Sequence, residues 1–268
     1  MKEKIKHQLR IPYSIMVLLG FDPRKTIHAI RNLPFYLYDL KILKNQQAFT
    51  KNSFPFGKFY PIFEERTMES GSAKGHYFHQ DLLVARRISL NNPKIHVDVG
   101  SRVDGFTAHV ASFRSIEVID IRPLSSHIPN VHFMQADLTK NLEKDLIDYC
   151  DSLSCLHAIE HFGLGRYGDP VNYDGHLIGL KNLYRILKRY GKLYISVPIG
   201  PQRIEFNAHR VFSIVYLLEL FVGKYQIDRF SFVDDRGDLH ENVTLTDDGI
   251  ENNFGCNYGC GIFEMTKL

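Results

Sequence analysis

The chain has 268 residues, of which 44% are hydrophobic and 24% charged, and its formal net charge is +3. This length suits one α/β domain, or one domain with an added cap, and it can bury a large core without disulfides. The small charge argues against nucleic acid as a partner, because phosphate contacts require clustered Lys and Arg.

The N-terminus and the cysteines bear on the compartment. A basic segment, "MKEKIKHQLR", precedes the apolar run "IPYSIMVLLGF", which is too short to span a bilayer and has no small-residue cleavage site after it. We interpret this run as a structured helix, with a surface-docking segment as the alternative. The four cysteines form no disulfide framework, which fits the cytoplasm. Cys256 and Cys260 could hold half of a metal site, but their spacing in "NNFGCNYGCG" favours a turn.

The pattern of elements changes near residue 75. Residues 1–75 carry aromatic-rich helical stretches without strands, and we predict a helical extension that caps the acceptor site. Residues 76–268 alternate helices with short apolar runs, which predicts a catalytic domain with a mostly parallel sheet. The predicted strands are residues 94–100, 115–121, 131–137, 151–157, 192–200, 228–235 and 261–268.

The end of the chain departs from this alternation. The nearly all-apolar segment "HRVFSIVYLLELFVG" predicts one buried helix that begins at His209 and Arg210. Two strands follow with a long polar loop and no helix between them, so we expect them to be antiparallel. The fold class is therefore α/β and Rossmann-like, with a seven-stranded, mostly parallel sheet, one reversed strand near the C-terminus and helices on both faces.

The loop after the first strand, "DVGSRVDGFTAH", excludes two phosphate-binding motifs. A P-loop needs Lys after its second Gly, but Phe106 follows Gly105 here. A dinucleotide fingerprint needs Gly at position 102, where this chain has Arg. Asp98 near the loop mouth would repel a pyrophosphate and suits a ligand with a positive amino group.

Acidic residues end the next two strands as well. Asp120 is placed to accept both hydroxyls of a ribose, and Asp137 can accept from an exocyclic amine. Each of them alone could be a helix cap or a turn residue. Together, acids at three successive strand ends predict a pocket for an adenosine that bears an amino acid.

These segments, in this order and spacing, resemble a known family. The motifs are "HVDVGSRVDGF", "VIDI", "FMQADL", "LHAIEHFGLGRYGDP" and "GKLYISVPIG". They look like the motifs of class I S-adenosylmethionine-dependent methyltransferases. With "GHYFHQDL", "IDIRPL" and "CGIFEMTKL", they resemble more narrowly an uncharacterised domain-of-unknown-function family of that fold, from about residue 74 onward. Arg102 departs from the common D-x-G-x-G-x-G pattern.

The resemblance implies S-adenosyl-L-methionine as cofactor and assigns residues to it. Asp98, Gly100, Ser101 and Gly105 would hold the methionine part. Asp120 would take the ribose hydroxyls beside Ile121, and Asp137 and Leu138 would meet the adenine. The helix that carries His79, Gln80 and Asp81 would close over the cofactor, and His157 would border it from the end of the fourth strand.

The string "HAIEH" at residues 157–161 also matches H-x-x-E-H, a zinc-hydrolase signature. That site requires both His on one helical face, whereas His157 ends a predicted strand and "GLGRYGDP" breaks any helix after His161. We therefore predict no metal site. We predict instead that His161 is a general base for a hydroxyl, with Glu160 as its partner, and that His209 contacts the acceptor. Structural roles for these residues are the alternative.

The predicted function is methyl transfer, which the resemblance links to O-methylation of a small molecule or a sugar in surface-polysaccharide biosynthesis. The alternatives are a non-catalytic binding or scaffold protein that kept the fold, and a zinc hydrolase. We expect a small-molecule or sugar acceptor, no nucleic acid and no integral membrane span.

Overall fold

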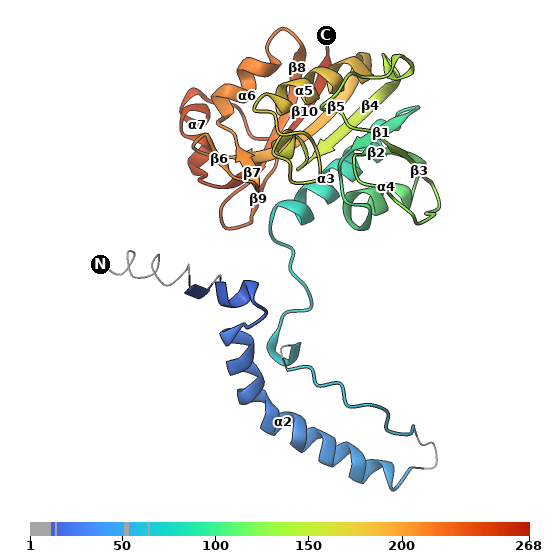
Figure 1. The fold of residues 1–268 in the computed structure, drawn as a ribbon, viewed down its shortest axis with the longest axis vertical. Coiled ribbons are helices and arrows are strands. Elements are labelled where there is room, and N and C mark those ends of the chain that lie inside the picture. The colour runs from blue at the N-terminus through green and yellow to red at the C-terminus, as the bar shows by residue number, and fades with distance from the viewer. Residues whose placement is uncertain (1–11, 14, 51–53, 64) are drawn as a thin grey trace, which may run out of the picture. The chain divides into compact units, whose positions relative to one another are not determined.

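The computed structural model describes residues 12–13, 15–50, 54–63 and 65–268, and the chain divides into two compact units, residues 1–72 and 73–268 (Figure 1). The basic segment at residues 1–10 lies outside the described residues. No helix in the described part of the chain is long and apolar enough to cross a membrane.

The first unit is built on helix α2, Pro23–Gln47, followed by the short 3-10 helix η1, Glu65–Thr67. Asp22 caps α2, because its side chain accepts hydrogen bonds from the backbone amides of Arg24 and Lys25, and a proline opens the helix. None of the residues of α2 is buried. The capping role that the sequence assigns to residues 1–75 stays a prediction.

The second unit contains an eight-stranded sheet in the order β3-β2-β1-β4-β5-β10-β8-β9. Strands β1 to β5 pair in parallel, and β10 runs antiparallel to both of its neighbours. The strands are β1 (His96–Val99), β2 (Ile116–Asp120), β3 (Val131–Gln135), β4 (Cys150–Leu156), β5 (Leu187–Ile199), β8 (Tyr225–Val233), β9 (Leu239–His240) and β10 (Gly259–Lys267). The predicted mostly parallel sheet with a reversed C-terminal strand is confirmed.

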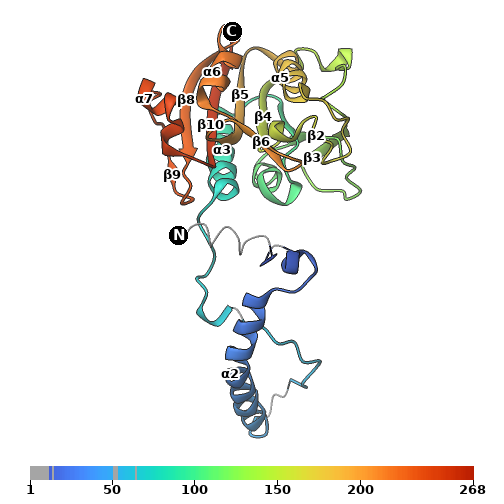
Figure 2. The ribbon, with the colours of Figure 1, turned by 60° about the vertical axis from the view of Figure 1, so that its left-hand side comes forward.

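Two apolar clusters cover the two faces of this sheet, as the pattern of alternating strand residues requires. Val118 belongs to the cluster that contains residues of α3 (His76–Asn91) and α4 (Ala108–Ala111). Its neighbour Ile119 belongs to the cluster that contains residues of α5 (Gly175–Ile186) and α6 (Ile214–Phe221). Figures 1 and 2 show this layered arrangement.

Three details differ from the prediction. The sheet has eight strands rather than seven, because the two-residue β9 adds an edge. A short helix, α7 (Asp247–Glu251), lies in the loop between the last two long strands, where Thr246 caps it by accepting from the amide of Gly249. The predicted helix from His209 is also wrong at its start.

The segment before α6 forms a hairpin instead. Strands β6 (Arg203–Glu205) and β7 (His209–Val211) pair as a separate two-stranded sheet. The helix begins only at Ile214, because the Ser213 side chain caps it by accepting from the amide of Tyr216. His209 therefore lies on a strand and not at a helix N-terminus.

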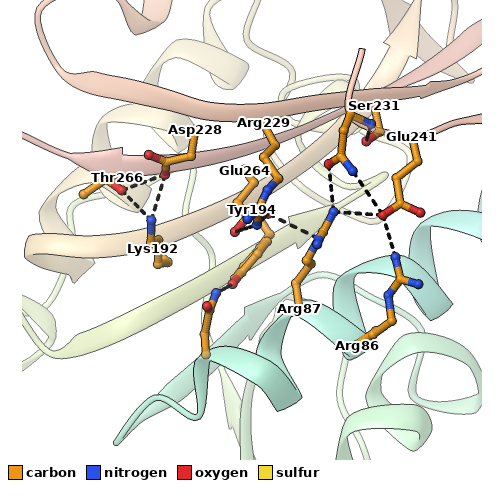
Figure 3. Close-up of polar contacts among 12 residues, drawn as sticks. Arg86, Arg87, Lys192, Tyr194, Asp228, Arg229, Ser231, Glu241, Glu264 and Thr266 are labelled. Carbon is orange, nitrogen blue, oxygen red and sulfur yellow. Dashed lines mark hydrogen bonds and ion pairs between the residues drawn. The ribbon is translucent and has the colours of Figure 1, made fainter. Parts of the chain in front are cut away.

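A polar network joins α3 to β8, β10 and the loop after β9 (Figure 3). Arg87 donates to Glu241 at 2.9 Å and to Asn242 at 2.8 Å, and its Nε lies 3.5 Å from the carboxylate of Glu264. Arg86 contacts the same Glu241 oxygen at 2.6 Å. The two arginines differ in exposure, because the Arg87 side chain is 14% exposed and that of Arg86 is 53% exposed.

We expect Arg87→Met to lower the free energy of unfolding by about 2–3 kcal/mol, because it leaves the buried Glu264 carboxylate with less compensation. Arg86→Met is the matched control and should cost less than about 1 kcal/mol, since exposed ion pairs contribute little. Urea unfolding of both variants measures this difference. Equal losses would contradict the assignment of Arg87 as the structural member of the pair.

Candidate functional site

A cavity of about 250 Å³ opens beyond the carboxyl ends of β1 to β4. This is where the strand order reverses, between β1 and β4, and ligands of open α/β sheets bind at such a point. A second cavity of about 310 Å³ shares Tyr77, Arg102 and Leu156 with the first. The two cavities together fall within the roughly 300–1,000 Å³ of small-molecule sites.

The cavities bring together most of the residues that the sequence predicts for a cofactor. The first cavity is lined by Gly100, Asp120, Ile121, Asp137, Leu138, His157 and His161. The second is lined by Gln80, Asp81, Ser101 and Gly105. Four predicted residues line neither cavity, namely His79, Asp98, Glu160 and His209.

Asp98 is fully buried and shapes the first loop from beneath. Its carboxylate accepts hydrogen bonds from the amide and hydroxyl of Ser101 and from the Ser154 hydroxyl at 2.5 Å. Burial raises the pKa of Asp98 to about 7, although the hydrogen bonds from Ser154 and Ser101 oppose the shift. Asp98 therefore holds the first loop in place, and this loop presents Ser101 to the second cavity.

The backbone explains why this loop needs a glycine at position 100 and tolerates Arg102. Gly100 has φ +78°, and a Cβ there would lie 2.7 Å from the Cβ of Ala158 in the loop after β4. Arg102 has φ −69° and ψ 135°, an extended conformation open to any residue. The departure from D-x-G-x-G-x-G thus costs no backbone strain at position 102.

Asp120 ends β2 and Asp137 follows β3, as predicted. Both carboxylates already accept hydrogen bonds from residues close to them in the sequence. The Arg122 side chain donates two hydrogen bonds to the Asp120 carboxylate, at 3.0 Å and 2.6 Å, and the Arg122 backbone amide donates a third at 2.8 Å. Asp137 accepts from the amide and hydroxyl of Thr139 at 2.9 Å and 2.6 Å. Burial alone would raise the pKa of Asp137, but the Thr139 hydrogen bonds lower it.

Helix α3 supplies Gln80 and Asp81 to the second cavity. The amide of Gln80 donates to Asp81 at 3.1 Å, and its carbonyl oxygen accepts from the Ser196 hydroxyl. Burial raises the pKa of Asp81, against the lowering effect of the hydrogen bond from Gln80. His79 packs edge-on against Phe78 and lines neither cavity.

The "HAIEH" string does not form a helix with both His on one face. His157 follows β4 in the left-handed region, at φ 49°, and residues Ile159–His161 form one 3-10 turn, η4. His157 Nδ1 lies 2.7 Å from Glu160 Oε1, whereas His161 Nδ1 lies 2.7 Å from the carbonyl oxygen of Ala208. The backbone therefore changes conformation between the two histidines, as predicted, and no continuous helix carries both of them.

The charges of this segment depend on Glu160, which is 1% exposed. Burial alone would lower the pKa of His157, but the Cys260 sulfur and the Glu160 carboxylate raise it to about 10. Burial lowers the pKa of His161, against the opposing effect of Glu160 at 3.7 Å. Glu160 is therefore ionised between one charged and one neutral imidazole.

The β6–β7 hairpin holds this segment in place. The Arg210 guanidinium is 5% exposed and donates to the carbonyl oxygens of Glu160, Phe162 and Tyr173. His209, beside it, stands 3.5 Å from Glu205 and against the ring of Tyr258. The predicted contact of His209 with an acceptor stays a prediction.

The sequence reading missed several cavity residues, among them basic and aromatic ones. Arg122 and Arg166 both lie over the ring of Tyr167, at 4.7 Å and 5.2 Å from its centre. Arg102, Arg122 and Arg166 line the cavity together. Arg102 and Arg122 pair with carboxylates, whereas Arg166 donates to the carbonyl oxygen of Ala208 and forms no ion pair within the described residues. The segment "GRYGDP" could have indicated Arg166 and Tyr167 as cavity residues, since it places them in the loop after β4.

A family model described as Caenorhabditis protein of unknown function, DUF268, matches residues 108–253, more than half of the chain. The chain belongs to this family. No curated protein matches the sequence of this DUF268 member.

Solved structures with a similar fold are methyltransferases or their relatives. A 1,6-didemethyltoxoflavin-N1-methyltransferase from Burkholderia thailandensis, solved with 1,6-didemethyltoxoflavin and S-adenosylhomocysteine, is 15% identical, with a TM-score of 0.50 over 73% of this chain and 79% of its own. The 4+2 cyclase SpnF is 15% identical, with a TM-score of 0.49 over 70% and 80%. The N-methyltransferase NodS from Bradyrhizobium japonicum is 11% identical, with a TM-score of 0.45 over 72% and 88%. The DUF268 chain thus has the class I methyltransferase fold.

Proposed function

We propose that this protein is an S-adenosylmethionine-dependent methyltransferase that methylates a hydroxyl of a small molecule or a sugar. The observation that carries the proposal is the pair of adjoining cavities at the strand ends of a class I methyltransferase fold, both lined by acidic residues. The fold alone would not support this proposal, because one fold hosts many functions and the function must be argued from the site.

The residues present fit the cofactor. Asp120 would take the ribose hydroxyls, and Asp137 with Leu138 would meet the adenine. Asp81 and Ser101 line the second cavity, where a positive amino group would compensate the buried Asp81 carboxylate. This placement assigns to Asp81 the direct contact that the sequence reading gave to Asp98.

His161 is suited to accept a proton from the acceptor. Its Nδ1 proton is donated to the Ala208 carbonyl oxygen, which leaves Nε2 with a free lone pair. When bound, S-adenosylmethionine supplies a methyl group on a positively charged sulfur. His161 Nε2 would take the proton of the acceptor hydroxyl, whose oxygen would attack this methyl group. Glu160, 3.7 Å from Nε2, then stabilises the imidazolium.

The arginines indicate the class of acceptor. Arg166 forms no ion pair within the described residues and lines the cavity beside Tyr167, an arrangement that suits a phosphate or carboxylate stacked near an aromatic ring. A nucleotide sugar carries both a phosphate and free hydroxyls, in line with the polysaccharide role that the sequence resemblance implies. We assign the reaction to the cytoplasm, with residues 1–75 as the acceptor-site cap.

One observation favours a second candidate, a binding or scaffold protein without catalysis. Arg122 already occupies both carboxylate oxygens of Asp120. Isothermal titration of the full chain with S-adenosylhomocysteine separates the two candidates. Methyltransferase function predicts binding with a Kd below roughly 1 mM, the upper end of the usual range of KM. Absence of heat and of any thermal stabilisation at millimolar ligand would leave the second candidate.

A further inference from the structure

Three metal-ligating side chains from distant parts of the chain converge beside the cavity. His76 begins α3, His157 follows β4 and Cys260 lies in β10, and their ligand atoms all lie within 4.8 Å of one another. We propose that this cluster binds a divalent transition metal of the zinc class. Neither the H-x-x-E-H string nor the C-x-x-x-C pair describes this site, because it takes only one residue from each.

His157 is oriented as a metal-ligating histidine. Its Nδ1 is paired with Glu160 at 2.7 Å, and its Nε2 is buried with no hydrogen-bond partner among the described residues. A carboxylate on one imidazole nitrogen and a metal on the other is the usual arrangement of ligating histidines. A buried polar atom without a partner is otherwise costly, so this nitrogen points to a ligand.

The other two side chains complete a soft donor set. The His76 ring stacks on that of His157, with the ring centres 5.1 Å apart and the planes at 13°. Cys260 is 0% exposed, and its sulfur lies 3.8 Å from Gln80 Oε1 and 4.0 Å from the Gly261 carbonyl oxygen, within 4.8 Å of the ligand atoms of both histidines. This burial keeps Cys260 from attacking a substrate as a nucleophile but suits a thiolate ligand. One sulfur and two imidazoles are a donor set that zinc prefers.

The geometry leaves room for a fourth ligand. Tetrahedral zinc with bonds of about 2.0–2.3 Å separates its ligand atoms by about 3.5 Å, so binding would draw these atoms, which lie within 4.8 Å, together by up to about 1 Å. The His76 ring would also turn out of its stack on His157, because an imidazole lone pair lies in the plane of its ring. Three protein ligands with an open position are typical of reactive zinc sites rather than structural ones. His157 also lines the cavity, so the open position would lie next to bound acceptor.

Metal binding can be measured without cofactor or acceptor, so this inference does not depend on the proposed function. The full chain is purified without chelators or affinity metals, and its zinc content is measured by mass spectrometry. The metal-free protein is then titrated with Co²⁺, whose absorption spectrum reports thiolate coordination. We expect about one zinc per chain and a cobalt–thiolate charge-transfer band that saturates at one equivalent.

Matched variants locate the site. Cys260→Ser should abolish the charge-transfer band, and Cys256→Ser, four residues away in the same turn region, should retain it. Glu160→Gln should weaken Co²⁺ binding about 10- to 100-fold, because it disturbs the orientation of His157. Thermal unfolding of the metal-free variants checks that each is folded. A wild-type protein that binds neither metal, or a charge-transfer band that survives Cys260→Ser, would overturn the proposal.

Discussion

Asp120→Ala is expected to weaken S-adenosylhomocysteine binding about 10- to 100-fold. Hydrogen bonds to a charged group contribute about 1.5–3 kcal/mol each, and a loss of 1.4 kcal/mol is tenfold in affinity. Two such bonds sum to about 3–6 kcal/mol, but the loss should be smaller than this sum, because Asp120 must first release Arg122, which it binds through both carboxylate oxygens. Isothermal titration of wild type and variant measures the difference.

Arg122→Ala is the control for this prediction. It frees the Asp120 carboxylate without removing it, so the affinity for S-adenosylhomocysteine should stay the same or rise. Both variants should unfold at similar temperatures without ligand, since Arg122 is half-buried and the pair lies at the cavity edge. Unchanged affinity in Asp120→Ala would remove Asp120 from the ribose site.

The sheet could be predicted from the sequence because its signals are local. Each parallel strand is a short apolar run that ends in Asp, Gly or His, and the strand ends of such sheets share one edge. Asp120 and Asp137 therefore lie at the cavity where the pattern put them. Their roles toward a cofactor stay predictions.

Ser213 is a local signal for the start of α6, but the hairpin before it could not be predicted because its cause is not local. The apolar pattern from Val211 to Val222 is interrupted only by Ser213 and Glu219. Arg210, however, donates hydrogen bonds to three backbone carbonyl oxygens in the segment that follows β4. These tertiary contacts stabilise strand β7 where the apolar periodicity predicted a helix. The hairpin in turn places the Ala208 carbonyl that sets the tautomer of His161.

The roles of Asp98 and of the histidines were hidden for a similar reason. Nothing near Asp98 in the sequence shows that Ser154 of β4 would consume one of its carboxylate oxygens. Likewise, the meeting of His76, His157 and Cys260 depends on β10 being inserted beside β5 in the sheet order. The sequence shows which residue types are present, but which of them contact one another depends on the topology of the sheet.

His161→Ala is expected to lower kcat for methyl transfer about 10²- to 10⁴-fold, the range typical of a general base. The Kd for S-adenosylhomocysteine should not change, because His161 holds no cofactor group in the proposed assignment. The measurement is transfer of the labelled methyl group of S-adenosylmethionine to a panel of nucleotide sugars. His127→Ala, in an exposed loop, is the matched histidine control.

The pH profile distinguishes a base from a merely structural histidine. Burial lowers the pKa of His161 below its usual 6.5, so the neutral, proton-accepting form persists at pH values where an exposed histidine is charged. The wild-type kcat should therefore fall only as the pH drops below 6.5, and should be flat above it. His161→Ala should lose this acid limb along with its turnover. A variant with wild-type kcat, or one that keeps the same acid limb at reduced rate, would assign His161 to holding the Ala208 carbonyl instead of moving the proton.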